Sequence, residues 1–359
     1  VWKTNIAIDQ KLPLGLIGTI EGIYNNNLNA VHYYNANLDV PTGNFAGADT
    51  RSQFARTDAG VRVNDNVSNG IVLTNKDGAY FKSLTLKLEL PYNKGLFGSF
   101  AWTTSNAKDF MSAGSIASGS WTSARAINGN NDLSLSNSDF VSPNRLVGVF
   151  GYRLEYGKKS GGATSISIGY VGNQGNPYTY TISGDMNGDR VNNNELLFVP
   201  NAFQDIRFIP LTVGSRVYSE VEQQAAFWNY INQDDYLKTR RGQYAERNAS
   251  FIPMLHRFDL SIVQDIFVSV KGKRNTLQIR ADILNFGNML NDKWGVSQRA
   301  TNPQVLAFNA VVNNQPTYRL ATERFADGTT GLITNTLSKN ASVLDVWTAQ
   351  LGIRYIFGK

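Results

Sequence analysis

The feature that most constrains this chain is a strict alternation of apolar and polar side chains, which is clearest in residues 345–357. In that segment every second side chain is apolar or aromatic: Trp347, Ala349, Leu351, Ile353, Tyr355 and Phe357. The side chains between them include Thr, Gln, Gly and Arg. A period of two residues is that of a β-strand with one apolar face and one polar face. We therefore predict a long strand here that lies between an apolar environment and water.

The size of this strand fits a membrane. A strand from Trp347 to Phe357 rises roughly 33 Å, and at a tilt of about 40° it spans roughly 25 Å of height. Such a height matches the apolar band of an outer-membrane barrel, which is bordered by aromatic side chains on both sides. The aromatic residues of this segment stand at its two ends, with aliphatic residues between them. Strands of soluble proteins are usually shorter.

The same alternation recurs along the chain and predicts about nine long strands. The expected strands lie near residues 2–9, 16–24, 83–92, 96–103, 145–156, 165–170, 257–262, 277–283 and 347–357. Their connections alternate in length. Short turns lie near residues 12, 93, 159 and 273, whereas polar stretches cover about 25–76, 105–144, 172–255 and 285–344. Within the third of these stretches, residues 220–232 are expected to form a short helix.

Short connections at one end and long ones at the other are typical of outer-membrane barrels, in which the turns face the periplasm and the loops lie outside the cell. We therefore expect an all-β fold: the antiparallel strands of a transmembrane outer-membrane β-barrel, with short periplasmic turns and long extracellular loops. The expected location is the outer membrane of a Gram-negative bacterium, where the chain is multi-pass and contacts outer-membrane lipid.

Composition excludes several other classes. No run of eighteen apolar residues occurs, so no transmembrane helix is predicted. Charged residues make up 17% of the chain, against about 25% in a typical soluble domain. The absence of Cys excludes disulfides and thiolate metal sites, and His32 and His256 alone cannot form a histidine metal cluster. The net charge of +6 is spread along the chain without a dense basic block, so no nucleic-acid partner is expected.

The number of strands indicates a part of a larger barrel. Bacterial single-chain barrels have an even number of strands, and nine strands alone would leave a bare edge in lipid. Val1 lies inside the first alternating segment. We therefore expect residues 1–359 to be the C-terminal portion of a barrel domain whose earlier strands precede Val1.

Several motifs, taken in order, resemble those of a known family. They lie at residues 184–189 with 194–200, at 240–248, at 256–260, at 283–290, and in the terminal strand 347–357. Together they resemble the C-terminal half of the barrel of TonB-dependent outer-membrane transporters, most of all the Oar-like branch of Bacteroidota, which is related to the SusC-type transporters. The order of the motifs is more specific than any single one. Gly358 and Lys359 depart from the family pattern, which often ends at or just after the terminal aromatic residue.

The resemblance implies a 22-stranded barrel with an N-terminal plug, which this sequence lacks. It also implies energy coupling by the TonB–ExbB–ExbD complex through that plug. A surface lipoprotein is a further partner that the resemblance suggests. In the family, the barrel-assembly machinery reads a terminal strand that ends in aromatic residues. The candidate assembly signal here is Trp347, Leu351, Ile353, Tyr355 and Phe357. A lipid-facing strand without that role is the simpler alternative.

The expected function is therefore transport: a solute binds at the extracellular loops and moves through a plugged barrel. The alternatives are a passive porin or structural outer-membrane barrel, and a soluble β-rich surface adhesin. An enzyme in the barrel wall is disfavoured. The only candidate set, His256 with Asp259 and Ser261, cannot form a triad because His256 lies on the other face of its strand. No covalent chemistry is expected.

One segment suggests a metal ion. Asp185, Asn187 and Asp189 have the D-x-N-x-D spacing that opens a calcium loop, and Glu195 follows. Two departures from that pattern are Arg190, which stands where a calcium loop has glycine, and Glu195, which comes one position early. A loop held by Asx-turn hydrogen bonds explains the same residues. Calcium is thus the one cofactor that the sequence suggests, and both interpretations remain open.

Three further groups receive mainly structural interpretations. The mixed-charge set is expected to form an ion-paired loop over the barrel, with contact to substrate or plug as the alternative: Asp234, Asp235, Arg240, Arg241, Glu246 and Arg247. The aromatic set is expected to pin the longest loop, with stacking on a sugar or peptide as the alternative: Phe227, Trp228, Tyr230, Tyr236 and Tyr244. The inward charges are expected to pair across neighbouring strands or with a plug: Lys87, Glu89, Arg153, Glu155, Arg280 and Asp282.

Overall fold

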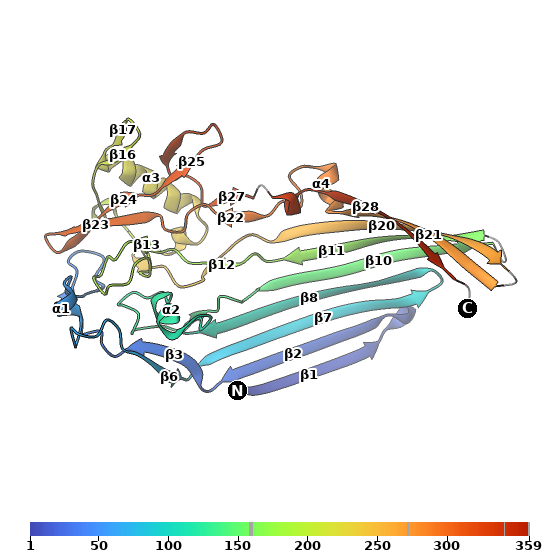
Figure 1. Cartoon of the computed structure of the whole chain (residues 1–359), viewed down its shortest axis with the longest axis horizontal. Helices are drawn as coiled ribbons and strands as arrows, with labels where there is room; N and C mark the ends of the chain where they lie inside the picture. The colour runs from blue at the N-terminus through green and yellow to red at the C-terminus, as the bar shows by residue number, and fades with distance from the viewer. Residues whose placement is uncertain (158–160, 271–272, 341, 358–359) are drawn as a thin grey trace.

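The long strands form a single antiparallel sheet in chain order. The structure, a computed structural model, describes residues 1–157, 161–270, 273–340 and 342–357. The sheet path is β1 (Trp2–Lys11), β2 (Ile17–Asn27), β7 (Ala79–Asn93), β8 (Leu96–Asp109), β10 (Asn144–Tyr156), β11 (Gly161–Asn173), β20 (Leu255–Val270), β21 (Lys273–Leu284) and β28 (Thr348–Ile356) (Figure 1). The short strand β9 (Ser136–Asn137) pairs with β8 at one end. Every long segment predicted from alternation lies in this sheet.

The register joins the apolar faces of the separate strands into one continuous surface. Residues directly opposite each other in an antiparallel pair point to the same side of the sheet. Leu86 lies opposite Ile20 on one side and Trp102 on the other, and Trp102 lies opposite Leu146. Further along the strands, equivalent rows of apolar residues cross the sheet as far as β28. The faces predicted from the sequence are therefore confirmed.

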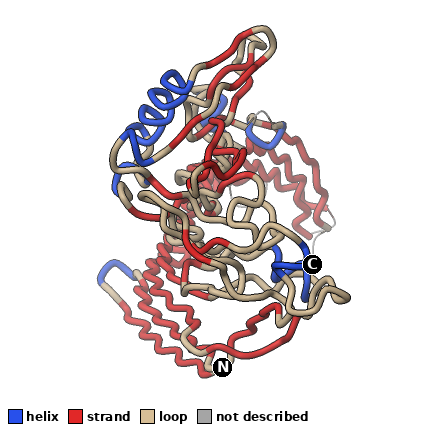
Figure 2. Tube along the Cα trace, turned by 90° about the vertical axis from the view of Figure 1, so that its left-hand side faces the viewer, coloured by secondary structure: helices blue, strands red, loops and turns tan. Residues whose placement is uncertain are grey.

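This apolar surface is exposed, whereas the opposite face is partly covered. In β7, Leu84, Leu86 and Leu88 are exposed, but the alternate polar residues Thr85 and Lys87 are half-buried. Side chains crowd together on the inner side of a curved sheet, and Figure 2 shows that this sheet is curved. An exposed apolar surface that spans a whole sheet is far larger than the few hundred Å² found on soluble monomers.

The charges on the polar face pair in two ways. Arg153 reaches Asp265 at 2.8 Å, from β10 to β20, and Glu155 accepts a hydrogen bond from Arg274 at 2.9 Å. Both pairs join different strands, but not neighbouring ones as predicted, because β11 lies between β10 and β20, and β11 and β20 lie between β10 and β21. For the other four residues the prediction is wrong, because they pair along one strand: Lys87 with Glu89, and Arg280 with Asp282. Residues two apart on a strand share a face, so their long side chains can meet there.

The short connections are tight at one end of the sheet. The 3-10 helix η1 (Pro13–Gly15) joins β1 to β2. Lys94 and Gly95 join β7 to β8, and both have positive φ, 49° and 93°, as a two-residue hairpin turn requires. The turns predicted at 157–162 and 271–275 lie partly outside the described residues, although their flanking strands pair as expected.

The long connections are not polar coils but fold together over the other end of the sheet (Figure 1). We call them the first (28–78), second (110–143), third (174–254) and fourth (285–347) outer loops, and their assembly the loop domain. The first holds β3 (Ala30–Asn35), β4 (Gly43–Asn44), β5 (Ser52–Gln53), α1 (Asp58–Val61) and β6 (Ile71–Lys76). The second holds α2 (Ala117–Thr122) and β9.

The third and fourth loops supply most of the elements of the loop domain. The third holds β12 (Pro177–Tyr178), β13 (Ile182–Ser183), β14 (Phe198–Val199), η2 (Phe203–Asp205), β15 (Arg207–Phe208), β16 (Leu211–Val213), β17 (Arg216–Tyr218), α3 (Glu220–Gln233), η3 (Leu237–Thr239), β18 (Gln243–Tyr244) and β19 (Ser250–Phe251). The fourth holds α4 (Phe286–Leu290), β22 (Gln298–Ala300), β23 (Leu306–Val312), β24 (Gln315–Leu320), β25 (Thr322–Arg324), β26 (Thr330–Leu332), β27 (Leu337–Lys339) and η4 (Val343–Asp345). The predicted helix near 220–232 is α3, which begins at Ser219 with a capping box to Glu222.

The loop domain has a hydrophobic core of its own. Phe227 and Tyr230 from α3 are buried against Leu197 from the third loop and Leu306 from the fourth. A four-stranded sheet in the order β13, β23, β24, β15 joins these two loops, and its outer pairs are parallel. The long connections thus act as one folded body that covers the outer end of the sheet.

The sheet remains open at both sides. Among the described residues β1 pairs only with β2, and β28 pairs only with β21, so the strands form an arc and not a closed ring (Figure 2). A backbone edge that is unpaired in lipid is strongly unfavourable. None of the described helices is long and apolar enough to cross a membrane.

Candidate functional site

The predicted calcium segment forms a compact loop in the third outer loop, between β13 and β14. We call residues 184–195 the acidic loop. Its backbone turns at Gly184, Gly188, Arg190 and Asn193, all of which have positive φ. Arg190, at φ 67°, itself adopts the left-handed conformation that glycine supplies in a calcium loop. The presence of Arg190 where a calcium loop has glycine therefore does not prevent the sharp turn at this position.

The acidic loop brings its three carboxylates together. One oxygen from each of Asp185, Asp189 and Glu195 lies within 4.8 Å of the others. Asp189 and Glu195 are buried, with 1% and 0% exposure, and Asp185 is half-buried. The tight turns explain this arrangement, because backbone N–H groups of the loop point inward. Gly188 donates to Asp185 at 2.8 Å and Val191 donates to Asp189 at 2.9 Å.

One carboxylate oxygen is left without a donor. Glu195 Oε1 accepts hydrogen bonds from the backbone N–H groups of Met186 and Asn187, at 2.8 and 3.0 Å. Its other oxygen, Oε2, is buried and has no hydrogen-bond partner among the described residues. Burial raises the pKa of Glu195 to about 8, and with the nearby carboxylates it raises the pKa of Asp189 to about 6. Oxygen ligands gathered in this way suit a hard cation.

Asn187, the fourth predicted ligand, is buried in the same loop. Its Oδ1 accepts a hydrogen bond from the backbone N–H of Asp189 at 3.0 Å, which is an Asx-turn contact. Its Nδ2 has no partner among the described residues. The two interpretations drawn from the sequence therefore apply to one loop: Asx-type hydrogen bonds shape the backbone, and the three acidic residues converge inside it.

Sequence analysis did not identify the residues of the first and second outer loops that surround the acidic loop. Arg51 is buried, pairs with Asp49 at 2.9 Å and donates to the carbonyl of Leu196 at 2.8 Å. Asn130 accepts a hydrogen bond at 2.9 Å from Asn194, whose side chain also reaches Asp189. These residues lie more than fifty positions away in polar stretches, where no local pattern marks them.

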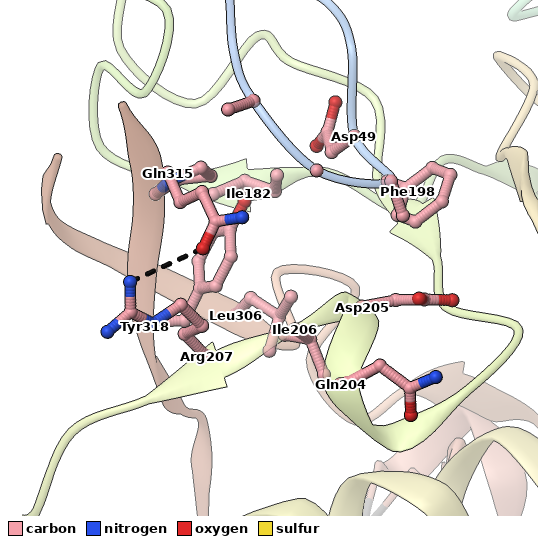
Figure 3. Close-up of a pocket in the computed structure, with 14 residues that line it drawn as sticks. Asp49, Ile182, Phe198, Gln204, Asp205, Ile206, Arg207, Leu306, Gln315 and Tyr318 are labelled. Carbon is pink, nitrogen blue, oxygen red and sulfur yellow. Dashed lines mark hydrogen bonds between the residues drawn. The ribbon is translucent and has the colours of Figure 1, made fainter. Parts of the chain in front are cut away.

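A small cavity opens beside this region (Figure 3). Its volume is about 200 Å³, and it is lined by residues of the first, third and fourth loops, including Asp49, Ile182, Arg207 and Tyr318. Arg207 donates to Gln315 at 3.3 Å across one wall. The cavity is smaller than the roughly 300–1,000 Å³ of typical ligand pockets, so it can hold only a small group.

A larger, polar cavity lies where the second, third and fourth loops meet. Its volume is about 480 Å³, and its lining includes Arg125, Asp139, Thr179, Arg247 and Gln304. The guanidinium of Arg247 pairs with Asp109. That of Arg125 donates to the backbone carbonyls of Ser123 and Ala124 and makes no ion pair among the described residues. This cavity is the better candidate for a polar solute.

Each member of the mixed-charge set contacts another part of the protein. Arg240 pairs with Glu246 at 3.1 Å, and Asp235 pairs with Lys238. Asp234 is buried and accepts hydrogen bonds from Tyr180 at 2.5 Å and Thr336 at 3.0 Å. Arg241 donates to Asn232, and Arg247 reaches Asp109. These contacts agree with the ion-paired loop that was preferred from the sequence.

The aromatic set is divided between core and surface. Phe227 and Tyr230 are buried in the loop-domain core, and Tyr236 packs against it. Tyr244 donates a hydrogen bond to Asp49 at 2.9 Å. Trp228 is half-buried outside the core, where it contacts the ring of Phe203 and the guanidinium of Arg241. Pinning of the loop therefore describes most of this set, while Trp228 keeps one side toward the surface.

The remaining predicted residues lie on the sheet. His256 is on the apolar face, opposite Gly172, and its Nδ1 contacts the Tyr170 hydroxyl at 2.8 Å. Asp259 is on the polar face and accepts a hydrogen bond from the backbone of Asn285, so no triad forms. The candidate assembly residues at the end of the chain are all exposed, and those inside β28 lie opposite apolar residues of β21: Trp347, Leu351, Ile353, Tyr355 and Phe357.

A comparison with known families gives one result. A model of the outer membrane beta barrel domain matches residues 1–340 of this chain. No curated protein and no solved structure matches it at a significant level.

Proposed function

Because this chain belongs to the outer membrane beta barrel domain family, we propose that it forms part of the wall and the outer loops of a TonB-dependent transporter of the Oar-like and SusC-like branch. In this proposal a solute binds in the loop domain. The TonB–ExbB–ExbD complex then acts on a plug supplied by other residues of the protein, and the solute passes along the polar face of the sheet.

The observation that carries the proposal is the combination of a two-sided wall with a folded outer cover. The wall has an exposed apolar face for lipid and a polar, ion-paired face for a lumen. The cover is the loop domain, whose core includes residues from distant loops such as Phe45, Phe227 and Leu306. A passive porin needs an open mouth, whereas a cover of this kind suits selective capture. A soluble adhesin would not leave a whole sheet face apolar.

The polar cavity around Arg125 is the proposed solute position. Its unpaired guanidinium, together with hydroxyl and amide groups, favours a solute with an acidic group. Any solute that copurifies with the full-length protein should be lost in Arg125→Gln and retained in Arg324→Gln, an exposed control in the same loop domain. Mass spectrometry of the purified proteins measures this, and equal retention in both variants would contradict the assignment.

Ion conductance separates the transporter from a passive porin. The full-length protein in a planar lipid bilayer should show little KCl conductance, which rises when urea unfolds the plug. It should also bind the periplasmic domain of TonB. A stable open channel in the absence of denaturant, with no TonB binding, would instead establish the passive porin.

A further inference from the structure

The acidic loop is the point at which all four outer loops meet. Phe54 of the first loop donates its backbone N–H to the carbonyl of Asn187 at 2.8 Å. From the second loop, Ala126 donates its backbone N–H to the carbonyl of Asn194 at 3.2 Å. From the fourth loop, the Tyr318 hydroxyl contacts the sulfur of Met186 at 3.1 Å. The acidic loop, part of the third outer loop, is therefore in direct contact with the other three outer loops.

The three carboxylates of this loop are not in ion-pair contact with a basic side chain of the described residues. Arg51 is buried beside the loop, but its ion pair is with Asp49. Arg56 donates to the backbone carbonyls of Asp185 and Met186 and not to a carboxylate. No Lys or Arg of the described residues forms an ion pair with Asp185, Asp189 or Glu195. Buried carboxylates without a contacting opposite charge are unfavourable even when they accept hydrogen bonds, so we expect protons or a bound cation to neutralise them.

We propose that Asp185, Asp189 and Glu195 bind one calcium ion, and that this ion fastens the four outer loops into a single domain. The donor set consists of carboxylate oxygens, which calcium prefers. The unpartnered Oε2 of Glu195 is the atom that most needs the ion, because nothing else described in the structure satisfies it. Calcium is favoured over magnesium because magnesium gives up its water reluctantly, and two of the three carboxylates are buried.

The competing explanation is that the loop holds protons and no ion. Glu195→Gln separates the two. Glutamine keeps a carbonyl oxygen that can accept from Met186 and Asn187, and it lacks the charge, so it mimics a protonated Glu195. If protons alone neutralise the loop, this variant should fold and behave like the wild type. If calcium does so, the variant should lose the ion.

The experiment is a calorimetric titration of calcium chloride into the full-length protein, purified in detergent and stripped with a chelator. We expect one ion per chain with a dissociation constant of about 10⁻⁴ to 10⁻³ M, the range of extracellular calcium modules. Glu195→Gln should weaken binding by roughly tenfold or more, because even the mutation of a residue that only hydrogen-bonds to a metal ligand has an effect of that size. Glu220→Gln, an exposed change in the same loop, is the matched control and should bind normally.

Three results would overturn the proposal: no saturable binding to the wild type, equal binding by Glu195→Gln, or equal binding of magnesium. Calcium held by copurified lipopolysaccharide would give equal signals in all variants and would therefore count against it. The measurement needs no solute and no TonB. A passive porin could bind calcium at this site, and a TonB-dependent transporter could lack the ion. The calcium proposal and the transport proposal are therefore tested separately.

Discussion

For single residues on the wall, the face on which a side chain lies decides what a substitution costs. Leu86 and Thr85 are neighbours in β7. Leu86 stands between Ile20 and Trp102 on the exposed apolar face, whereas the hydroxyl of Thr85 lies 3.0 Å from that of Thr103 on the polar face. Only the first of these positions meets lipid.

Leu86→Arg should therefore impair membrane assembly much more than Thr85→Arg. An arginine on the lipid side costs roughly 2–4 kcal/mol near the middle of the membrane. The fraction of heat-modifiable, folded protein in outer-membrane extracts measures the effect. Equal losses in the two variants would mean that the faces are assigned wrongly.

His32 gives the loop domain a dependence on pH. It is buried in β3 with its ring edge near Phe110, and burial, together with the charge of Lys76, lowers its pKa below 6.5. A lowered pKa means that the folded state resists protonation. The stabilisation is present above pH 6.5 and is lost as the pH falls toward the folded pKa.

We accordingly expect acidification from pH 7.5 to pH 5.5 to lower the unfolding temperature of the wild type by more, or to raise it by less, than that of His32→Gln. The comparison with the variant isolates His32, because the raised pKa values of Asp189 and Glu195 act in the opposite direction. Near-ultraviolet circular dichroism in detergent follows the transition. A His32→Gln variant with the full pH dependence of the wild type would show that other groups are responsible.

For whole elements, how well the sequence predicts a strand depends on the length of that strand. The nine wall strands have nine or more residues each, so their alternation identifies both their positions and their faces. The strands of the loop domain often have two or three residues, as in β13 and β15, and so few residues show no period. Their core residues come from loops more than a hundred positions apart, which no local pattern reveals.

The same contrast applies to the candidate site. The spacing of Asp185, Asn187 and Asp189 marks the acidic loop in the sequence, because the turn and its ligands are local. The unpartnered oxygen of Glu195, the surrounding Arg51 and the contact from Tyr318 depend on tertiary packing. Alternation likewise predicts which charges face inward, but not that Lys87 pairs along its own strand.

Loss of the terminal strand should impair membrane assembly more than loss of any other element. Deletion of residues 347–359 removes the partner of β21 and the exposed aromatic residues, so assembly should be abolished. Phe357→Ala, which keeps the strand, should slow assembly, and Thr348→Ala on the polar side should not. Pulse-labelling followed by protease protection of intact cells gives these rates. Normal assembly of both the deletion and Phe357→Ala would exclude the assembly-signal role.

For the whole molecule, the loop domain couples segments that are separate in the wall. Its four loops emerge from different hairpins and meet at the acidic loop. If calcium fastens this junction, its removal should loosen all four loops together and not the third alone.

Limited proteolysis of intact cells or detergent-purified protein tests this expectation. Chelation should make cleavage sites in the first, second, third and fourth loops accessible at the same calcium concentration, while the wall strands stay protected. The cleavage products can be identified by mass spectrometry. Cleavage confined to residues 184–195 would show that the ion acts only locally.

The parallel pairs between β13 and β23 and between β15 and β24 have a consequence for biogenesis. They join residues near 182 and 207 to residues near 306 and 317, and these segments reach the cell surface on different hairpins. The cover cannot mature until the last of those hairpins has crossed the bilayer. Its maturation is therefore a final step outside the cell, and a barrel that is stalled during insertion should display unfolded loops to the surroundings.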